Sequence, residues 1–440
     1  MTDLFTTPEM AELFSARALV ASMLRVEWAL ARALSRAEVI PTAAADAITA
    51  ACRIELYDPD AIFAEATTAG TPVIPLVRVL TERVDEKARD WVHWGATSQD
   101  IVDTAMVLQM RAGLALLKRE LHDIAHSAAT LADRHRHTVM PGRTLLQQAA
   151  PITFGLKAAR WLALTVRQMR ALDALRTDSL PLQFGGAVGT LASLGVAGID
   201  VESFLAEELA LPQPYLPWHA ERDRIGTVAA TLGVAASAMS KIASDVALHA
   251  QTEVGELSEG AKEGKGGSTA MPQKRNPVDA MSAIAAARLA VALVPPLISG
   301  DHEHERALGA WQVEWVALPQ LFRHTAGAVG HVRQLLAGLE VHHDRMLRNL
   351  QLAGGTLMAE ALTVALAAQV GRVEAQQLVK SASARALRDG IMLKQAAVED
   401  SRITGVLSAD DISQALDPSR YVGSSDSFID RAIGSYRILS

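Results

Sequence analysis

The sequence has few aromatic residues, one cysteine and no excess of positive charge. Only 4% of its 440 residues are aromatic although 50% are hydrophobic, so aliphatic side chains supply the core, and alanine-rich segments favour helices over strands. The single Cys52 excludes an internal disulfide and is typical of a reducing cytosol. A net charge of −7, with acidic and basic residues interspersed, provides no face for nucleic acid.

The sequence also lacks a recognisable export signal. Its start, Met1-Thr2-Asp3-Leu4, has neither a basic segment nor a continuous apolar segment, so we expect a cytoplasmic protein. One uncharged run, 179–199, is long enough to raise the question of a membrane span. It contains five glycines, Pro181 and Gln183, so we predict a buried connection and no membrane partner.

A chain of this length exceeds a single compact core, and its prolines divide it into three regions. We predict an N-terminal helical domain over 1–110, in which prolines interrupt short helices at Pro41, Pro59, Pro72 and Pro75. A central helical bundle domain follows over 111–355, and a C-terminal helical domain over 356–440 carries no motif that we can interpret. Long stretches without proline lie at 110–138, 154–176, 225–258 and 278–293.

The stretch 225–258 shows the clearest helical periodicity. Its apolar residues recur at steps of three and four: Ile225, Val228, Leu232, Ala235, Met239, Ile242, Val246, Ala250 and Val254. A helix of about thirty residues is ~45 Å long, which is more than one small domain buries, so we predict a homo-oligomer. The alternative is a monomeric helical scaffold.

The stretch 264–277, Gly-Lys-Gly-Gly-Ser-Thr-Ala-Met-Pro-Gln-Lys-Arg-Asn-Pro, is the strongest candidate for chemistry. Glycines let backbone N–H groups approach an anion, and Pro272 and Pro277 restrict the loop. Ser268 is the candidate base. Its hydroxyl is too weak an acid to ionise alone at neutral pH, and Lys274 is the nearest candidate cation. The alternative is a mobile basic linker; a phosphate-binding P-loop is excluded by the spacing.

Two other stretches contain polar residues in patterns typical of binding sites. In His93-Trp94-Gly95-Ala96-Thr97-Ser98-Gln99-Asp100, a hydroxyl of Thr97 or Ser98 caps a helix or binds a carboxylate. In 217–224, His219, Arg222 and Arg224 are candidates for binding an anion, or else ion-pair partners of Glu221 and Asp223. The alternating His302 and His304 do not share a helical face, and no His-Glu-x-x-His spacing exists, so no zinc site is predicted.

Three segments of the chain, 93–100, 142–155 and 267–277, resemble the shared regions of the fumarase/aspartase superfamily. The loop 267–277 resembles its Gly-Ser-Ser-x-Met-Pro-x-Lys-x-Asn-Pro signature with Thr269 in place of the second serine, and 93–100 resembles its His-x-Gly-x-Thr-Ser-x-Asp region. A third region, 142–155, places Thr144 and Gln147 on the Thr-x-x-Gln positions. The resemblance implies an all-α, three-domain fumarase/aspartase-like subunit with a long central helical bundle, a homotetramer with shared active sites, and neither metal nor organic cofactor.

The same resemblance implies roles for individual residues. Ser268 and Lys274 are the implied catalytic residues. The implied ligands of a small polycarboxylate substrate are His93, Thr97, Ser98, Thr144, Gln147, His219, Arg222 and Asn276.

Leu145 departs from the superfamily pattern, because many of its lyases have a histidine there that protonates the leaving group. The stretches 217–224 and 302–315 resemble the bacterial 3-carboxy-cis,cis-muconate cycloisomerases of protocatechuate catabolism (β-ketoadipate pathway). Their leaving group is a carboxylate, which with a pKa near ~4 needs no protonation. The sequence leaves open a 3-sulfomuconate cycloisomerase, another lyase such as adenylosuccinate or argininosuccinate lyase, and a non-enzymatic scaffold.

Overall fold

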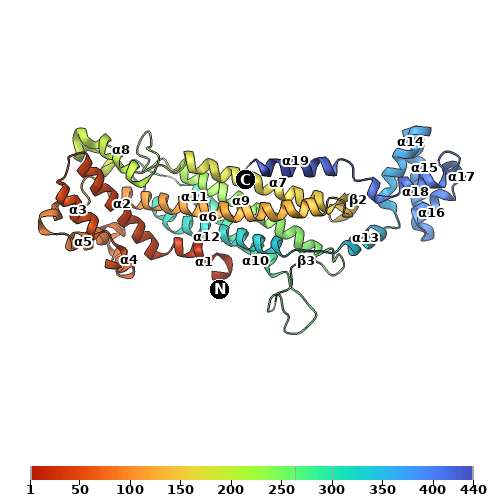
Figure 1. Cartoon of the computed structure of the whole chain (residues 1–440), viewed down its shortest axis with the longest axis horizontal. Helices are drawn as coiled ribbons and strands as arrows, with labels where there is room; N and C mark the ends of the chain where they lie inside the picture. Colours follow the sequence, from red (N-terminus) through yellow and green to blue (C-terminus); the bar gives the residue numbers. More distant parts are fainter. Residues whose placement is uncertain (1, 263, 301, 439–440) are drawn as a thin grey trace. The chain divides into compact units, whose positions relative to one another are not determined.

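A computed structural model describes residues 2–262, 264–300 and 302–438 of the chain. These residues are mainly helical, with two two-stranded sheets among them (Figure 1). The chain divides into two compact units, the first made of Met1–Leu121, Gln168–Ser240 and Ser282–His331, and the second of His122–Arg167, Lys241–Met281 and Val332–Ser440. The prediction of an all-α subunit is confirmed, whereas the division into three domains stays a prediction.

The N-terminal part of the first unit consists of short helices whose ends follow from the sequence. These are α1 (Pro8–Leu13), α2 (Ala16–Arg36), α3 (Thr42–Ala51), α4 (Pro59–Ala69) and α5 (Val73–Arg83), and α2 packs against α3 and against α8 (Gly198–Leu209). Asp58 caps α4, and Gly70 ends it in the left-handed conformation. Three of the predicted breaks, Pro41, Pro59 and Pro72, lie at helix starts, where a missing N–H costs little.

The long helices are α6 (Ser98–Arg134), α7 (Phe154–Asp178), α9 (Asp223–His249), α10 (Val278–Ala292) and α12 (Ala310–Ala337), and α11 (Val294–Ile298) is a short continuation after α10. Helix α6 begins earlier than the predicted stretch, at Ser98. Helix α9 ends at His249 instead of 258, because the chain turns there and the N–H of Glu256 bonds back to the His249 carbonyl. Helix α12 was missed by the prediction because it contains Pro319.

The second unit contains a β-hairpin of β1 (Val139–Thr144) and β2 (Gln147–Thr153), and a short pair of β3 (Leu257–Ser258) and β4 (Glu340–Val341). Helix α13 (His343–Gln351) packs on β1. The C-terminal helices are α14 (Ala359–Val370), α15 (Arg372–Asp389), α16 (Leu393–Val398), α17 (Ser401–Thr404), α18 (Ala409–Ala415) and α19 (Ser425–Arg437). Leu362, Leu366 and Leu393 belong to one buried cluster that joins α14 to α18.

Short 3₁₀ turns precede α1, at Thr2–Phe5, and lie between later helices, at Ile54–Leu56, Glu86–Trp91, Gly186–Val188, Ala192–Ala197, Thr356–Met358 and Pro418–Arg420. The uncharged run 179–199 lies partly in two of them. Its first half, 179–186, is buried as predicted, whereas Val188, Val196 and Ile199 are exposed, so the prediction of a buried connection is wrong for the second half. By length and composition alone, Asp223–His249 and Val278–Ile298 are apolar enough to cross a membrane.

Candidate active site

In the first unit, Asp100 organises the start of α6. Its buried carboxylate accepts hydrogen bonds from the backbone N–H groups of Thr97 at 3.0 Å, Gly185 at 3.0 Å and Gly186 at 2.9 Å. His219 Nε2 lies 2.7 Å from the same carboxylate. An aspartate in the first turn of a helix thus joins three segments that are far apart in the sequence, and the predicted residues Thr97 and His219 are among them.

His219 is buried in this arrangement and leaves no room for a side chain at Gly185. A Cβ atom at that position would lie 2.9 Å from His219 Cε1 and 2.7 Å from Pro217 Cβ. Gly186 has a φ of 68°, a left-handed conformation that glycine adopts readily. The two glycines are therefore required for the Asp100 contacts, and His219 is paired with Asp100 instead of Glu221 or Asp223.

Arg222 forms a second buried ion-pair group. Its guanidinium donates two hydrogen bonds to Asp103, at 2.7 and 3.0 Å, and bonds to Glu314 on α12, with Nε at 3.0 Å from Oε1. Trp311 Nε1 donates to Asp103 at 2.9 Å. Burial raises the pKa of Glu314, and the Arg222 charge and hydrogen bonds oppose that rise. Arg222 is thus engaged by two carboxylates, and its predicted contact with substrate stays a prediction.

Thr97 and Ser98 lie where α6 begins, as expected for capping residues. Ser98 is the first helical residue and is half-buried. The Thr97 hydroxyl accepts a hydrogen bond from Arg306 Nη1 at 3.1 Å, and Arg306 Nη2 donates to the Ala187 carbonyl at 2.9 Å. Arg306 was not among the predicted site residues, although it lies in the stretch 302–315 that carries the family resemblance.

His93 is paired with a carboxylate that the sequence analysis did not single out. Its Nδ1 lies 2.6 Å from Oε1 of Glu27 on α2. Burial lowers the pKa of His93, but the Glu27 charge and hydrogen bond, with a contribution from Asp100, outweigh it and raise the pKa above its ordinary value. The first unit therefore contains His93, Thr97, Ser98, His219 and Arg222.

In the second unit, the β1–β2 hairpin carries the predicted residues Thr144 and Gln147 on either side of its turn. The turn residues Leu145 and Leu146 have φ values of 51° and 63°, a conformation that favours glycine or asparagine. Their side chains are 96% and 77% exposed. Backbone strain of this kind costs on the order of 1–3 kcal/mol per residue and is common at functional sites.

A buried polar cluster anchors the hairpin. Arg143 on β1 donates two hydrogen bonds to the Glu256 carboxylate, at 2.8 and 2.7 Å. His249 Nδ1 lies 2.7 Å from Glu256, and Asn349 Nδ2 donates to it at 2.7 Å. Burial alone would raise the pKa of Glu256, but the bonds from His249, Arg143 and Asn349 lower it to about 2. Arg143 and Glu256 were missed by the sequence analysis, because they are 113 residues apart.

This cluster predicts an acid-sensitive contribution to stability. Because the folded-state pKa of Glu256 lies below its unfolded value of about 4.3, its contribution is present above that pH and is lost as pH falls towards about 2. Glu256→Gln is expected to lower the free energy of unfolding by about 2–3 kcal/mol at pH 7, and by about half as much near pH 3. Urea unfolding at both pH values measures this. The control is Glu253→Gln, at an exposed position, and an equal loss at both pH values would contradict the assignment.

The predicted signature loop lies between β3 and α10, and its two ends are joined. The N–H of Asn276 donates to the Gly266 carbonyl at 2.8 Å, and Asn276 Nδ2 donates to the Gly267 carbonyl at 3.3 Å. Gly266 has a φ of 70°, and a Cβ atom there would lie 2.6 Å from the Asn276 carbonyl oxygen, so only glycine fits. Asn276 therefore closes the base of the loop in addition to its predicted role with substrate.

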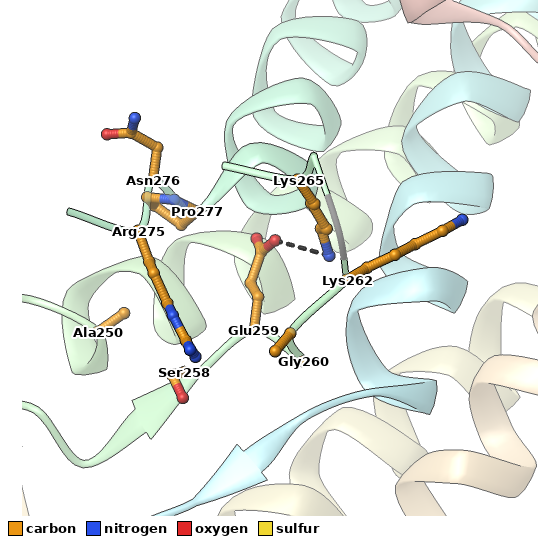
Figure 2. A pocket seen from close by; sticks show the side chains of 10 residues that line it. Ala250, Ser258, Glu259, Gly260, Lys262, Lys265, Arg275, Asn276 and Pro277 are labelled. Carbon is orange, nitrogen blue, oxygen red and sulfur yellow. Dashed lines mark ion pairs between the residues drawn. The ribbon is translucent and has the colours of Figure 1, made fainter. Parts of the chain in front are cut away.

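A lysine other than the predicted one, Lys265, is half-buried and forms ion pairs at the base of this loop. Lys265 Nζ lies 3.0 Å from the Glu259 carboxylate (Figure 2). It also bonds to Asp279. The Glu259 carboxylate accepts the N–H groups of Asp279 and Ala280, at 3.2 and 2.9 Å, in the first turn of α10. Glu259, Lys265 and Arg275 line a cavity of 460 Å³ (Figure 2).

The two predicted catalytic residues lie in the exposed part of the loop. Ser268 is half-buried, and its Oγ accepts the N–H of Met271 at 3.2 Å. The N–H of Lys274 donates to the Met271 carbonyl at 3.0 Å, and the Lys274 side chain is exposed. Among the described residues, Lys274 Nζ makes no ion pair. The second unit thus contains Ser268, Lys274, Asn276, Thr144 and Gln147, and the catalytic roles of Ser268 and Lys274 stay predictions.

No group of three or more His, Cys, Asp or Glu side chains within the described residues is arranged to hold a metal ion. The polar groups instead supply backbone donors, hydroxyls and cations, which suit binding of an anionic substrate and stabilisation of developing negative charge.

Comparison with known proteins identifies the class. A family model for lyases matches residues 4–290, and a model for the C-terminus of adenylosuccinate lyase matches residues 355–432. The chain belongs to the fumarase/aspartase superfamily of lyases.

Individual relatives cover nearly the whole chain. A 3-carboxy-cis,cis-muconate cycloisomerase of Pseudomonas aeruginosa is 44% identical over 99% of this chain and 96% of that protein. The crystal structure of the 3-carboxy-cis,cis-muconate lactonizing enzyme from Pseudomonas putida matches with a TM-score of 0.95 and 38% identity, covering 100% of this chain and 99% of that one. A nitrosuccinate lyase of Streptomyces davaonensis is 40% identical over 94% of this chain and 90% of that protein.

Proposed function

We propose that the protein is a cycloisomerase that interconverts 3-carboxy-cis,cis-muconate and 4-carboxymuconolactone in the cytoplasm. The observation that carries this proposal is the side chain at the hairpin turn. Where many lyases of the superfamily have a histidine that protonates the leaving group, this chain has Leu145, which transfers no proton. The relatives named as 3-carboxy-cis,cis-muconate cycloisomerases support the same assignment.

The chemistry explains why a leucine is tolerated. In the lactonising direction, a substrate carboxylate adds across a conjugated C=C bond, and a proton is delivered to the carbon beside another carboxylate. In reverse, Ser268 removes that proton, and the lactone carboxylate leaves with the electron pair of the broken C–O bond. A carboxylate with a pKa near ~4 leaves without protonation, unlike an amine.

The more difficult step is the formation of negative charge beside the second carboxylate. Proton removal there passes through an enediolate-like dianion, which requires donors already in place. The proposed donors are Lys274, Asn276 and the backbone of Gly266 and Gly267. The Met271 N–H that bonds to Ser268 Oγ supports the assignment of this oxygen as the base, because the same donor stabilises negative charge on it.

An ultraviolet assay of the purified protein with 3-carboxymuconate tests the function. We expect the absorbance of the conjugated diene to disappear as the lactone forms. Fumarate, nitrosuccinate and adenylosuccinate serve as comparison substrates. No turnover of 3-carboxymuconate, together with turnover of one of the others, would overturn the proposal.

The replacement Leu145→His tests the reason for the leucine. If the leaving carboxylate needs no acid, the histidine is expected to leave kcat unchanged or to lower it by intruding on the site. Steady-state kinetics measure the effect, with Leu146→His on the other turn position as the control. A large gain in kcat at Leu145→His would show that protonation had been limiting.

We also propose that the protein works as a homotetramer with shared active sites. The long helices expose apolar side chains that a soluble monomer rarely leaves uncovered, among them Val234 on α9, Met281 on α10 and Ile298 on α11. In the second unit, Leu145 and Leu146 at the hairpin turn are exposed as well. Light scattering in dilute solution is expected to give a tetramer mass. A monomer mass at micromolar concentration would contradict both the assembly and the shared sites.

A further inference from the structure

Glu27 is a carboxylate in an apolar environment. It lies in the interior of α2, between the buried residues Val26 and Ala29, and only 1% of its surface is exposed. An ionised carboxylate in such a place is costly unless a partner compensates it. Its hydrogen-bond partner is His93, whose Nδ1 lies 2.6 Å from Glu27 Oε1. The reaction proposed above does not explain why the helix carries this residue.

His93 is itself held in an uncommon conformation. Its φ is 59°, in the left-handed region that non-glycine residues seldom occupy. It follows the 3₁₀ turn Glu86–Trp91, and an edge contact between the rings of Trp91 and Trp94 flanks it, with centroids 5.4 Å apart. Strain of this kind persists where the surrounding structure imposes it, and it is concentrated at functional sites.

The charges that face this pair favour a protonated histidine. Glu27 from α2 and Asp100 from α6 are both negative and both raise the pKa of His93. Cys52 and Tyr57 also lie near Glu27, but burial raises the pKa of the thiol and of the phenol, so neither of them ionises near neutral pH. The 2.6 Å contact and the two facing carboxylates therefore favour the protonated form of His93, with Nδ1 as the donor to Glu27.

With Nδ1 engaged, the ring has one donor left. The His93 side chain keeps 19% of its surface exposed, and within the described residues its Nε2 makes no hydrogen bond. Two arginines of the first unit, Arg222 and Arg306, differ from His93 because their guanidinium groups are bonded to several protein groups. Arg222 is buried between Asp103 and Glu314, and Arg306 bonds to Thr97 and Ala187.

We propose that Glu27 is a positioning residue that keeps His93 protonated and oriented, so that its Nε2–H binds one carboxylate of the substrate. The proposal rests on the proposed function only for the nature of the anion, a polycarboxylate. A purely structural ion pair is the alternative. It predicts lower stability without Glu27, but no particular change in substrate binding with pH.

The coupling between the two residues is measurable without substrate. In protein labelled with ¹³C-histidine, the His93 signal is assigned by its absence in His93→Gln. In the wild-type protein it is expected to titrate above about 6.5, the value of an unperturbed histidine, and in Glu27→Gln at least about one pH unit lower than in the wild type. A wild-type His93 that titrates at or below the unperturbed value overturns the proposal, whether or not the variant folds.

The consequence for binding follows from kinetics as a function of pH. At pH 8, Glu27→Gln is expected to raise KM roughly 10-fold to 100-fold, the range for loss of one charge-assisted hydrogen bond, with kcat within about 3-fold. The difference in KM between Glu27→Gln and the wild type is expected to narrow towards pH 6, because His93 then becomes protonated in a larger fraction of the variant even without the Glu27 charge. Glu27→Asp, which retains the charge, is expected to recover part of the wild-type KM.

The matched control is Glu12→Gln, an exposed glutamate on α1, which is expected to leave both constants unchanged. If the Glu27→Gln variant folds and its KM equals that of the wild type at every pH, the proposal is overturned, and the His93–Glu27 pair has only a structural role. If the wild-type protein turns over no 3-carboxymuconate, the proposed function fails. The histidine titration still decides whether Glu27 controls the charge of His93.

Discussion

Replacing Ser268 by alanine is expected to lower kcat by roughly 10²–10⁴, the range for loss of a general acid or base, with KM changed much less. The hydroxyl lies in the exposed part of the signature loop, and its hydrogen bond within the described residues, from the Met271 N–H, is local to the loop. The base of the loop is closed by Asn276 and Gly266, so the loop is expected to keep its conformation in the variant.

Lys274→Ala is expected to change both kinetic constants, in contrast to Ser268→Ala. Its side chain is exposed and available for a substrate carboxylate, so its loss is expected to raise KM and also to lower kcat, because the same cation stabilises the dianion. The matched control is Lys262→Ala, an exposed lysine at the edge of the cavity. Steady-state kinetics of the three variants test this. If Ser268→Ala kept a near-normal kcat while Lys274→Ala lost it, the proton transfer would belong to Lys274.

Several helices and the signature loop could be predicted from the sequence, because their signals lie within a few neighbouring residues. Stretches without proline coincide with α6, α7, α9 and α10, and the hydroxyls of Thr97 and Ser98 mark the start of α6. The fumarase/aspartase signature located the loop before α10. Helix α12 was not predicted, because the prediction was based on long stretches without proline and this helix contains Pro319.

The partners of the site residues could not be predicted from local pattern. Glu27 is one acid among apolar residues on α2, and its partner His93 is 66 residues away in the sequence. The alternative to substrate binding paired Arg222 with the nearby Glu221 or Asp223, but its partners are Asp103 and Glu314, at separations of 119 and 92 residues. Such pairs are set by the packing of helices, and the local pattern of one sequence carries little information about them.

Removing the charge of Arg222 is expected to have the largest effect on stability. Arg222→Met leaves Asp103 and Glu314 buried without their cation, and breaking a buried pair in this way costs about 3–5 kcal/mol in free energy of unfolding. Arg167→Met, at an exposed position of α7, is the control and is expected to change stability by at most ~0.5 kcal/mol. Urea unfolding at pH 7 measures both variants.

The pH dependence of the Arg222→Met loss separates unpaired charge from lost packing. Burial already raises the pKa of Glu314 in the wild-type protein, and without Arg222 that pKa rises further, so the folded variant binds more protons than the unfolded chain above about pH 4. Its deficit is therefore expected to shrink as pH falls from 7 towards 5, because the buried carboxylates become neutral. Adding Asp103→Asn and Glu314→Gln is expected to recover part of the loss at pH 7 for the same reason. A deficit that is independent of pH, or below about 1 kcal/mol, would mean that the two carboxylates find other partners and that Arg222 contributes mainly its stacking on Trp218, which lies 4.7 Å from the guanidinium carbon.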